Sequence, residues 1–401
     1  MRRFFAVAIT IAICLGFAIP TQGQEEIPFD QPQVAYSFGE ELIITTEIAA
    51  DISIQTIKIV LQPEVSADSV ADEIFLTSPN EATYSRNLSQ NPLPAFSRIE
   101  YWYQGELENG DTFSSQHFSF VYTDNRFDWQ SLQTEEFEIF WYEGDSDFGQ
   151  QILNTAYAGL ERIRQHVSVP APQKVAFYVY ANATEMQSVL QLSGQIATWI
   201  AGHANPALGM SLVSIPAGTS QSVEIKRQVP HELTHILLYR KLGDSYGNLP
   251  QWLNEGLAST SELSPDPNYA LLLEKAYERK MLIPLAQLCD IFPTDAANFQ
   301  LAYAQSASFT YYLQTKFGPT GMENLIAAYA DGLDCERGVE VGLSATLSEL
   351  EGNWRHVTFD ENMFFVAINN MLPWVLILAV VLLPTLGLAF VGKKKNNEER
   401  I

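Results

Sequence analysis

The spacing of apolar residues changes along the chain. Between residues 25 and 125, short segments rich in β-branched residues partly alternate apolar and polar side chains, chiefly at 42–48, 52–61, 97–104 and 116–122. This alternation is typical of half-buried strands. Closely spaced short strands predict an all-β domain over residues 25–125, a β-sandwich of the immunoglobulin-like type.

The pattern becomes mixed after about residue 130. Strands are expected at 137–142 and 174–181, helices at 147–166 and 184–191, and extended segments at 196–201 and 209–215. From residue 222 to about 357 the apolar spacing is almost entirely helical. Strands followed by helices predict an α+β domain over residues 130–357. We expect segment 209–215 to be an edge strand that can pair with an extended peptide.

The two ends of the sequence predict targeting rather than folded structure. Two arginines and an apolar run to residue 19 indicate a signal peptide over 1–23. The uncharged apolar stretch 371–392 precedes three lysines, which is typical of a transmembrane helix with its basic flank in the cytoplasm. We therefore expect a single-pass protein of the cell membrane, with extracytoplasmic N-terminal domains and a cytoplasmic tail at 393–401.

The net charge limits the classes of partner that the protein can bind, and the cysteines bear on the compartment in which it folds. The formal net charge is −24, and such a surface repels nucleic acid, so nucleic acid is excluded as a partner. Outside the predicted signal peptide, the sequence has two cysteines, Cys289 and Cys335. In an exported protein they form either a disulfide or two buried thiols, and the sequence leaves both open.

A metal-binding motif lies in the helical region. Residues 231–235 read H-E-x-x-H. On a helix, His231 and His235 lie on one face, so both imidazoles can reach one Zn²⁺ ion. Glu232 is then placed to take a proton from a metal-activated water rather than to bind the metal.

A catalytic zinc needs a third protein ligand and an open position. Glu255 is the candidate, because Pro250 suits the start of a second helix and the intervening turn can bring that helix back against the first. Pro230 leaves two possibilities, a helix that starts near it or a helix that is kinked there. An acid, with Asp244 among the candidates, is expected to orient His235.

These motifs resemble the gluzincin metallopeptidases, and within them the bacterial peptidase MA-like domain. The resemblance rests on residues 229–235 and 250–258, with support from 302–309 and 347–354, and it covers roughly 130–357. It implies a thermolysin-like mixed fold, hydrolysis of peptide bonds and the ligands His231, His235 and Glu255.

Gluzincins usually add a Tyr or His that donates a hydrogen bond to the developing oxyanion. Tyr303 is our candidate, with Tyr311 and Tyr312 as rivals on the same predicted helix. We expect a zinc metallopeptidase acting on a peptide or protein substrate, with Glu232 and Tyr303 as catalytic residues. The alternative is a cell-surface binding protein whose peptidase-like domain is inactive, although the intact Glu232 speaks against it.

Overall fold

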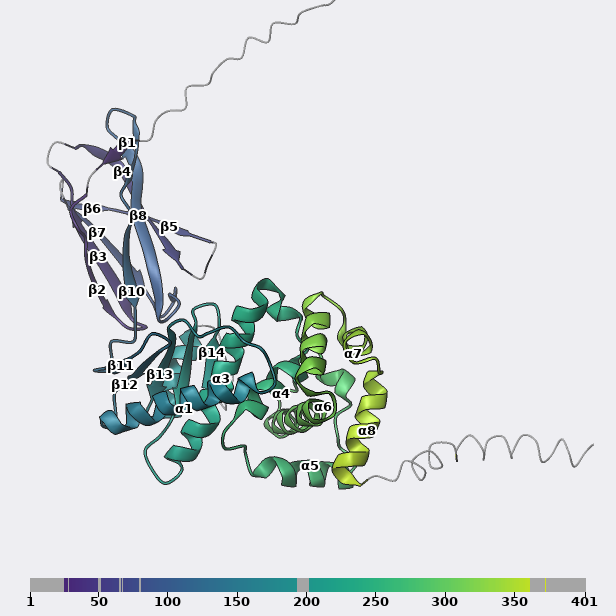
Figure 1. Cartoon of the computed structure of the whole chain (residues 1–401). Helices are drawn as coiled ribbons and strands as arrows, with labels where there is room; N and C mark the ends of the chain where they lie inside the picture. The colour runs from purple at the N-terminus through teal and green to yellow at the C-terminus, as the bar shows by residue number, and fades with distance from the viewer. Residues whose placement is uncertain are drawn as a thin grey trace, which may run out of the picture. The chain divides into compact units, whose positions relative to one another are not determined.

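The computed structural model describes residues 25–360, apart from 28, 50–51, 65, 67, 79–80 and 193–201, together with Leu372 (Figure 1). The predicted signal peptide lies outside the described residues, as does the predicted membrane helix except for Leu372. Among the described residues, no helix has both the length and the apolar character needed to cross a bilayer. The chain divides into two compact units, one ending at Arg126 and the other starting at Phe127.

The first unit consists of β-strands arranged in two sheets. The larger sheet contains β1 (Glu25–Ile27), β4 (Ile54–Pro63), β5 (Val70–Ile74), β8 (Ser97–Leu107), β9 (Thr112–Ser115) and β10 (Phe118–Tyr122). The smaller sheet contains β2 (Gln33–Ser37), β3 (Glu41–Glu47), β6 (Leu76–Ser78) and β7 (Glu81–Asn87).

Aromatic contacts join the two sheets. Along β3, Leu42 and Ile44 are buried while the residues beside them are exposed or half-buried, as the alternating sequence predicts. The rings of Tyr36 on β2 and Tyr122 on β10 are 5.1 Å apart in an edge-to-face arrangement, a favourable geometry for aromatic pairs. The expected all-β unit is present, and its immunoglobulin-like type stays a prediction.

The second unit begins with a mixed sheet. Its strands are β11 (Gln130–Gln133), β12 (Phe137–Trp141), β13 (Val175–Tyr180), β14 (Gly202–Asn205) and β15 (Met210–Ser214). Their order is β11-β12-β13-β15-β14, with β12, β13 and β15 mutually parallel and β14 antiparallel to β15.

The expected edge position of segment 209–215 is wrong. β15 lies between β13 and β14 and is buried along its whole length. The edge strand beyond β15 is β14, whose four residues carry no apolar alternation that would have marked them as a strand.

The described part of this unit also contains ten helices, most of which follow the sheet in the sequence. They are α1 (Ser146–Arg164), α2 (Ala183–Leu192), α3 (Gln221–Leu242), η1 (Gly243–Asn248), α4 (Gln251–Ser261), α5 (Asn268–Glu278), η2 (Leu285–Leu288), α6 (Ala296–Ala330), α7 (Cys335–Leu343) and α8 (Leu347–Phe359). The predicted order of strands and then helices is confirmed. A disulfide joins Cys289 to Cys335, which decides between the two possibilities left open for these cysteines.

Helix α3 contributes to two cores. Val229, Leu233 and Ile236 pack in a cluster with the sheet and α1, whereas Leu238 belongs to a second cluster with α4 and the later helices. Because α3 is packed on both sides, the side chains between these two stripes are held in fixed positions.

Pro230 lies well inside α3, since the helix already begins at Gln221. Proline has no N–H, so the carbonyl of Lys226 loses its helical hydrogen bond. The N–H of Leu263, in the segment after α4, donates to that carbonyl instead, at 2.9 Å. The proline therefore leaves an acceptor that ties the end of α4 to α3.

Candidate metal centre

Three side chains from two helices converge at one point. His231 and His235 project from α3 and Glu255 from α4. The Oε2 atom of Glu255 lies 3.3 Å from His231 Nε2 and 3.6 Å from His235 Nε2. One ligating atom from each residue lies within 4.8 Å of the others. The structure thus brings together the three residues predicted to hold a metal.

Close packing of α4 brings Glu255 to this point. A Cβ atom added at Gly256 would lie 2.0 Å from Thr310 Oγ1 on α6, so only glycine allows α4 to approach α6 this closely. At the start of α4, the N–H of Gln251 donates to the carbonyl of Cys289 at 2.7 Å. The side-chain amide of Gln251 donates to Glu255 Oε1 at 3.0 Å, which leaves Oε2 facing the histidines.

The other nitrogen of each imidazole is held by a polar partner. His231 Nδ1 is 3.0 Å from Glu262 Oε1, and His235 Nδ1 is 3.1 Å from Asn254 Oδ1. If Nδ1 carries the proton it donates, Nε2 keeps its lone pair for the centre of the cluster.

The expected acid partner of His235 is not what the structure places there. An amide, Asn254, and the hydroxyl of Tyr246, at 3.3 Å, face His235 Nδ1. The carboxylate that orients an imidazole is Glu262, and it acts on His231. Glu262 directly follows the last residue of α4, and the sequence analysis did not single it out.

The donor set fits a zinc ion. The buried Oε2 of Glu255 has no hydrogen-bond partner among the described residues, although two imidazole nitrogens face it. Burial on its own would raise the pKa of Glu255, but the imidazoles of His235 and His231 hold that pKa well below its ordinary value. Two neutral imidazoles and one carboxylate are a known set of ligands for catalytic zinc.

Glu232 lies beside this cluster and against strand β14. It is 6% exposed, and burial is the first cause that raises its pKa above the ordinary value. A Cβ atom at Gly202 would lie only 2.4 Å from Glu232 Oε1. The strand can pass this close to the carboxylate only because residue 202 has no side chain.

Of the three candidate tyrosines, Tyr303 lies at the cluster. Its ring centroid is 6.1 Å from that of His231. Burial, and then the negative charge of Glu255, raise the pKa of Tyr303 well above its ordinary value, so its hydroxyl keeps its proton. Tyr311 is 61% exposed, and the hydroxyl of Tyr312 accepts a hydrogen bond from Lys316 at 2.9 Å.

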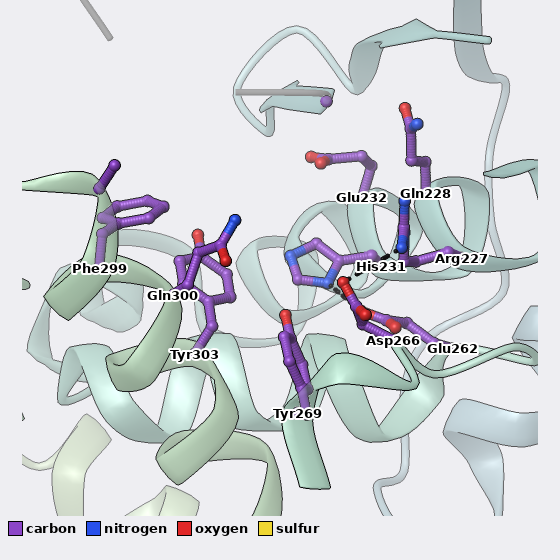
Figure 2. A pocket seen from close by; sticks show the side chains of 12 residues that line it. Arg227, Gln228, His231, Glu232, Glu262, Asp266, Tyr269, Phe299, Gln300 and Tyr303 are labelled. Carbon is purple, nitrogen blue, oxygen red and sulfur yellow. Dashed lines mark hydrogen bonds and ion pairs between the residues drawn. The ribbon is translucent and has the colours of Figure 1, made fainter. Parts of the chain in front are cut away.

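A cavity of about 200 Å³ opens onto His231, Glu232 and Tyr303. Figure 2 shows Glu262 and Asp266 on one side of His231, and Phe299 and Gln300 on the opposite side, next to Tyr303. Sequence analysis singled out neither group. Glu262 and Asp266 lie between α4 and α5, and Phe299 and Gln300 lie on α6, so only the fold reveals that the two groups share a cavity.

The chain was compared with protein families, curated proteins and solved structures. The family model of the peptidase MA superfamily matches residues 155–360, and the search of curated proteins found no match. An aminopeptidase N family protein from Idiomarina loihiensis is similar at 7% identity over 77% of this chain and 70% of its own, with a TM-score of 0.31.

Two smaller solved structures are also similar over part of the chain. A structure titled as a myokine covers 25% of this chain and 99% of its own at 9% identity, with a TM-score of 0.21. A β-1,3-glucan binding domain of carbohydrate-binding module family 56 covers 22% and 95% at 10% identity, with a TM-score of 0.17. Scores this low do not establish a shared fold. The family model, in contrast, spans more than half of the 401 residues: the chain belongs to the peptidase MA superfamily.

Proposed function

We propose that this protein is a zinc-dependent metallopeptidase of the gluzincin type that hydrolyses peptide bonds. The observation that carries the proposal is the convergence of His231, His235 and Glu255 within 4.8 Å, beside a cavity that His231 and Glu232 line. Membership of the peptidase MA superfamily supports it.

Each residue has one task in this proposal. His231, His235 and Glu255 would hold a zinc ion, which when bound would supply the Lewis acidity for peptide hydrolysis. Glu232 takes the proton of the attacking water and passes it to the leaving amine, as a general base and then a general acid. The hydroxyl of Tyr303 donates to the oxyanion.

The proposed location is the outer face of the cell membrane. The predicted signal peptide and the apolar segment 371–392 motivate this, and the disulfide between Cys289 and Cys335 supports export, because such bonds persist in oxidising compartments. A protease added to intact cells should digest the N-terminal domains if they lie outside the membrane. Full protection of these domains would contradict the proposed orientation.

Substitution of Glu232 separates catalysis from metal binding. Glu232→Gln keeps the shape of the side chain but cannot accept the proton. We expect it to abolish hydrolysis of a peptide library while metal analysis still finds about one zinc per chain. Undiminished turnover in this variant would remove Glu232 from the mechanism.

Substitution of Glu255 tests the third ligand. Glu255→Ala removes the carboxylate that lies within 3.6 Å of both imidazoles. We expect both zinc and hydrolysis to be lost, as for wild type treated with a chelator. Full zinc occupancy in this variant would mean that a different residue completes the site.

A further inference from the structure

The cavity beside the metal cluster has two chemically different walls. One wall is polar and carries Arg227, Glu262 and Asp266, and the other is built by Phe299 and Tyr303 of α6. Tyr269 lies between them, below His231 in Figure 2. A group bound here would meet charge on one side and aromatic rings on the other.

Negative charge predominates on the polar wall. Arg227 Nη2 is 2.6 Å from both carboxylate oxygens of Glu224, and Arg227 Nη1 is 3.3 Å from Asp266 Oδ2. One guanidinium thus faces two carboxylates. The side chain of Asp266 is 24% exposed, so a ligand in the cavity can reach it.

Glu262 adds an unpaired acceptor to this wall. The residue is only 4% exposed, and Oε1 faces His231. Its second oxygen, Oε2, has no hydrogen-bond partner within the part of the chain that the structure describes. A buried carboxylate oxygen without a donor is costly, and a cationic donor entering the cavity would relieve that cost.

We propose that this cavity is a subsite for a positively charged group of the peptide substrate, an ammonium or a guanidinium, bound at Asp266 and Glu262. The inference rests on the proposed peptidase function. The apolar part of such a group lies along Tyr269 and Phe299, since aromatic faces attract cations and pack against their aliphatic stems. At about 200 Å³ the cavity has room for a side chain rather than a lone water.

Two parts of a peptide can supply this charge, a Lys or Arg side chain near the scissile bond or the free N-terminal amine. The full chain first digests a mixed peptide library, and mass spectrometry locates the cleaved bonds. Matched peptides are then compared with Lys or Nε-acetyl-lysine at each flanking position, and with a free or acetylated N-terminus.

We expect acetylation at one of these places to lower kcat/KM by about tenfold or more, the size of a lost charge-assisted hydrogen bond. A loss on Nε-acetylation identifies the side chain as the source, and a loss on N-terminal acetylation identifies the α-amine. In Asp266→Asn, the ratio between charged and acetylated peptides should fall towards one. Glu274→Gln, which removes one exposed charge from α5 outside the cavity, should keep the wild-type ratio.

Binding gives a second readout that does not depend on turnover. Glu232→Gln is titrated with the same fluorescent peptide pairs, and the charged member should bind more tightly. Equal cleavage and equal binding of all pairs would overturn the subsite even if peptides are cleaved. A preference that survives Asp266→Asn would also overturn it. Failure of wild type to cleave any peptide would instead sink the proposed function, and the binding ratio would still decide on the subsite.

Discussion

A steric constraint on the proposed general base lies at Gly202, where strand β14 passes Glu232. An alanine at this position places a Cβ atom 2.4 Å from Glu232 Oε1 and 3.0 Å from its Cδ. An ordinary van der Waals contact needs at least 3.4 Å, so the carboxylate or the strand must move by about 1 Å. Misplacement of a catalytic group by this amount costs about 100-fold in rate.

We therefore predict that Gly202→Ala lowers kcat about 100-fold, or about 2.7 kcal/mol in the activation barrier. Zinc content should remain near one per chain, because the three atoms nearest to the new Cβ all belong to Glu232, which is not one of the proposed metal ligands. The assay is steady-state hydrolysis of a cleaved peptide, with metal analysis of the same samples.

Gly247→Ala is the matched control, because a Cβ added there meets no atom within 4 Å. It should retain wild-type kcat. A folded Gly202→Ala variant that works within twofold of wild type would refute the reasoning, since it would mean that the position of Glu232 against β14 does not limit catalysis.

Two further predictions concern the support of the site. Glu262→Ala leaves His231 Nδ1 without its acceptor at 3.0 Å. Zinc binding, measured by competition with a chelator, should weaken by about 10–100-fold. Unchanged zinc affinity would show that the contact is dispensable. Replacing Cys289 and Cys335 by alanine removes a disulfide between cysteines 46 residues apart in the sequence. This change should lower the free energy of unfolding by up to about 4 kcal/mol in urea denaturation. A variant as stable as the oxidised wild type would contradict this.

The sequence predicted what depends on regular spacing. Two histidines one turn apart share a helix face regardless of the rest of the fold, and the structure brings Glu255 to them. The change from strand to helix patterns was equally readable. The four-residue strand β14, in contrast, has no periodic signal, so the strand that contacts Glu232 was not anticipated and β15 was placed at the edge in its stead.

Contacts between segments far apart in the sequence could not be predicted, for a different reason. Whether Cys289 meets Cys335 depends on a Cα–Cα distance of 6.0 Å, which no local pattern encodes. The choice of Tyr303 over Tyr311 likewise depends on which face of α6 turns towards α3. Spacing gave three candidates on one helix, and only packing places one of them against His231.

Pro230 links the local sequence to the geometry of the cluster. A residue with an N–H at this position would bond the carbonyl of Lys226 and complete the helix. Proline leaves that carbonyl free, and it accepts from the N–H of Leu263. Leu263 directly follows Glu262, the carboxylate that orients His231. The hydrogen bond missing from α3 is therefore replaced by one that fixes the segment carrying the partner of its own histidine, so the residue that weakens the helix locally also positions the site.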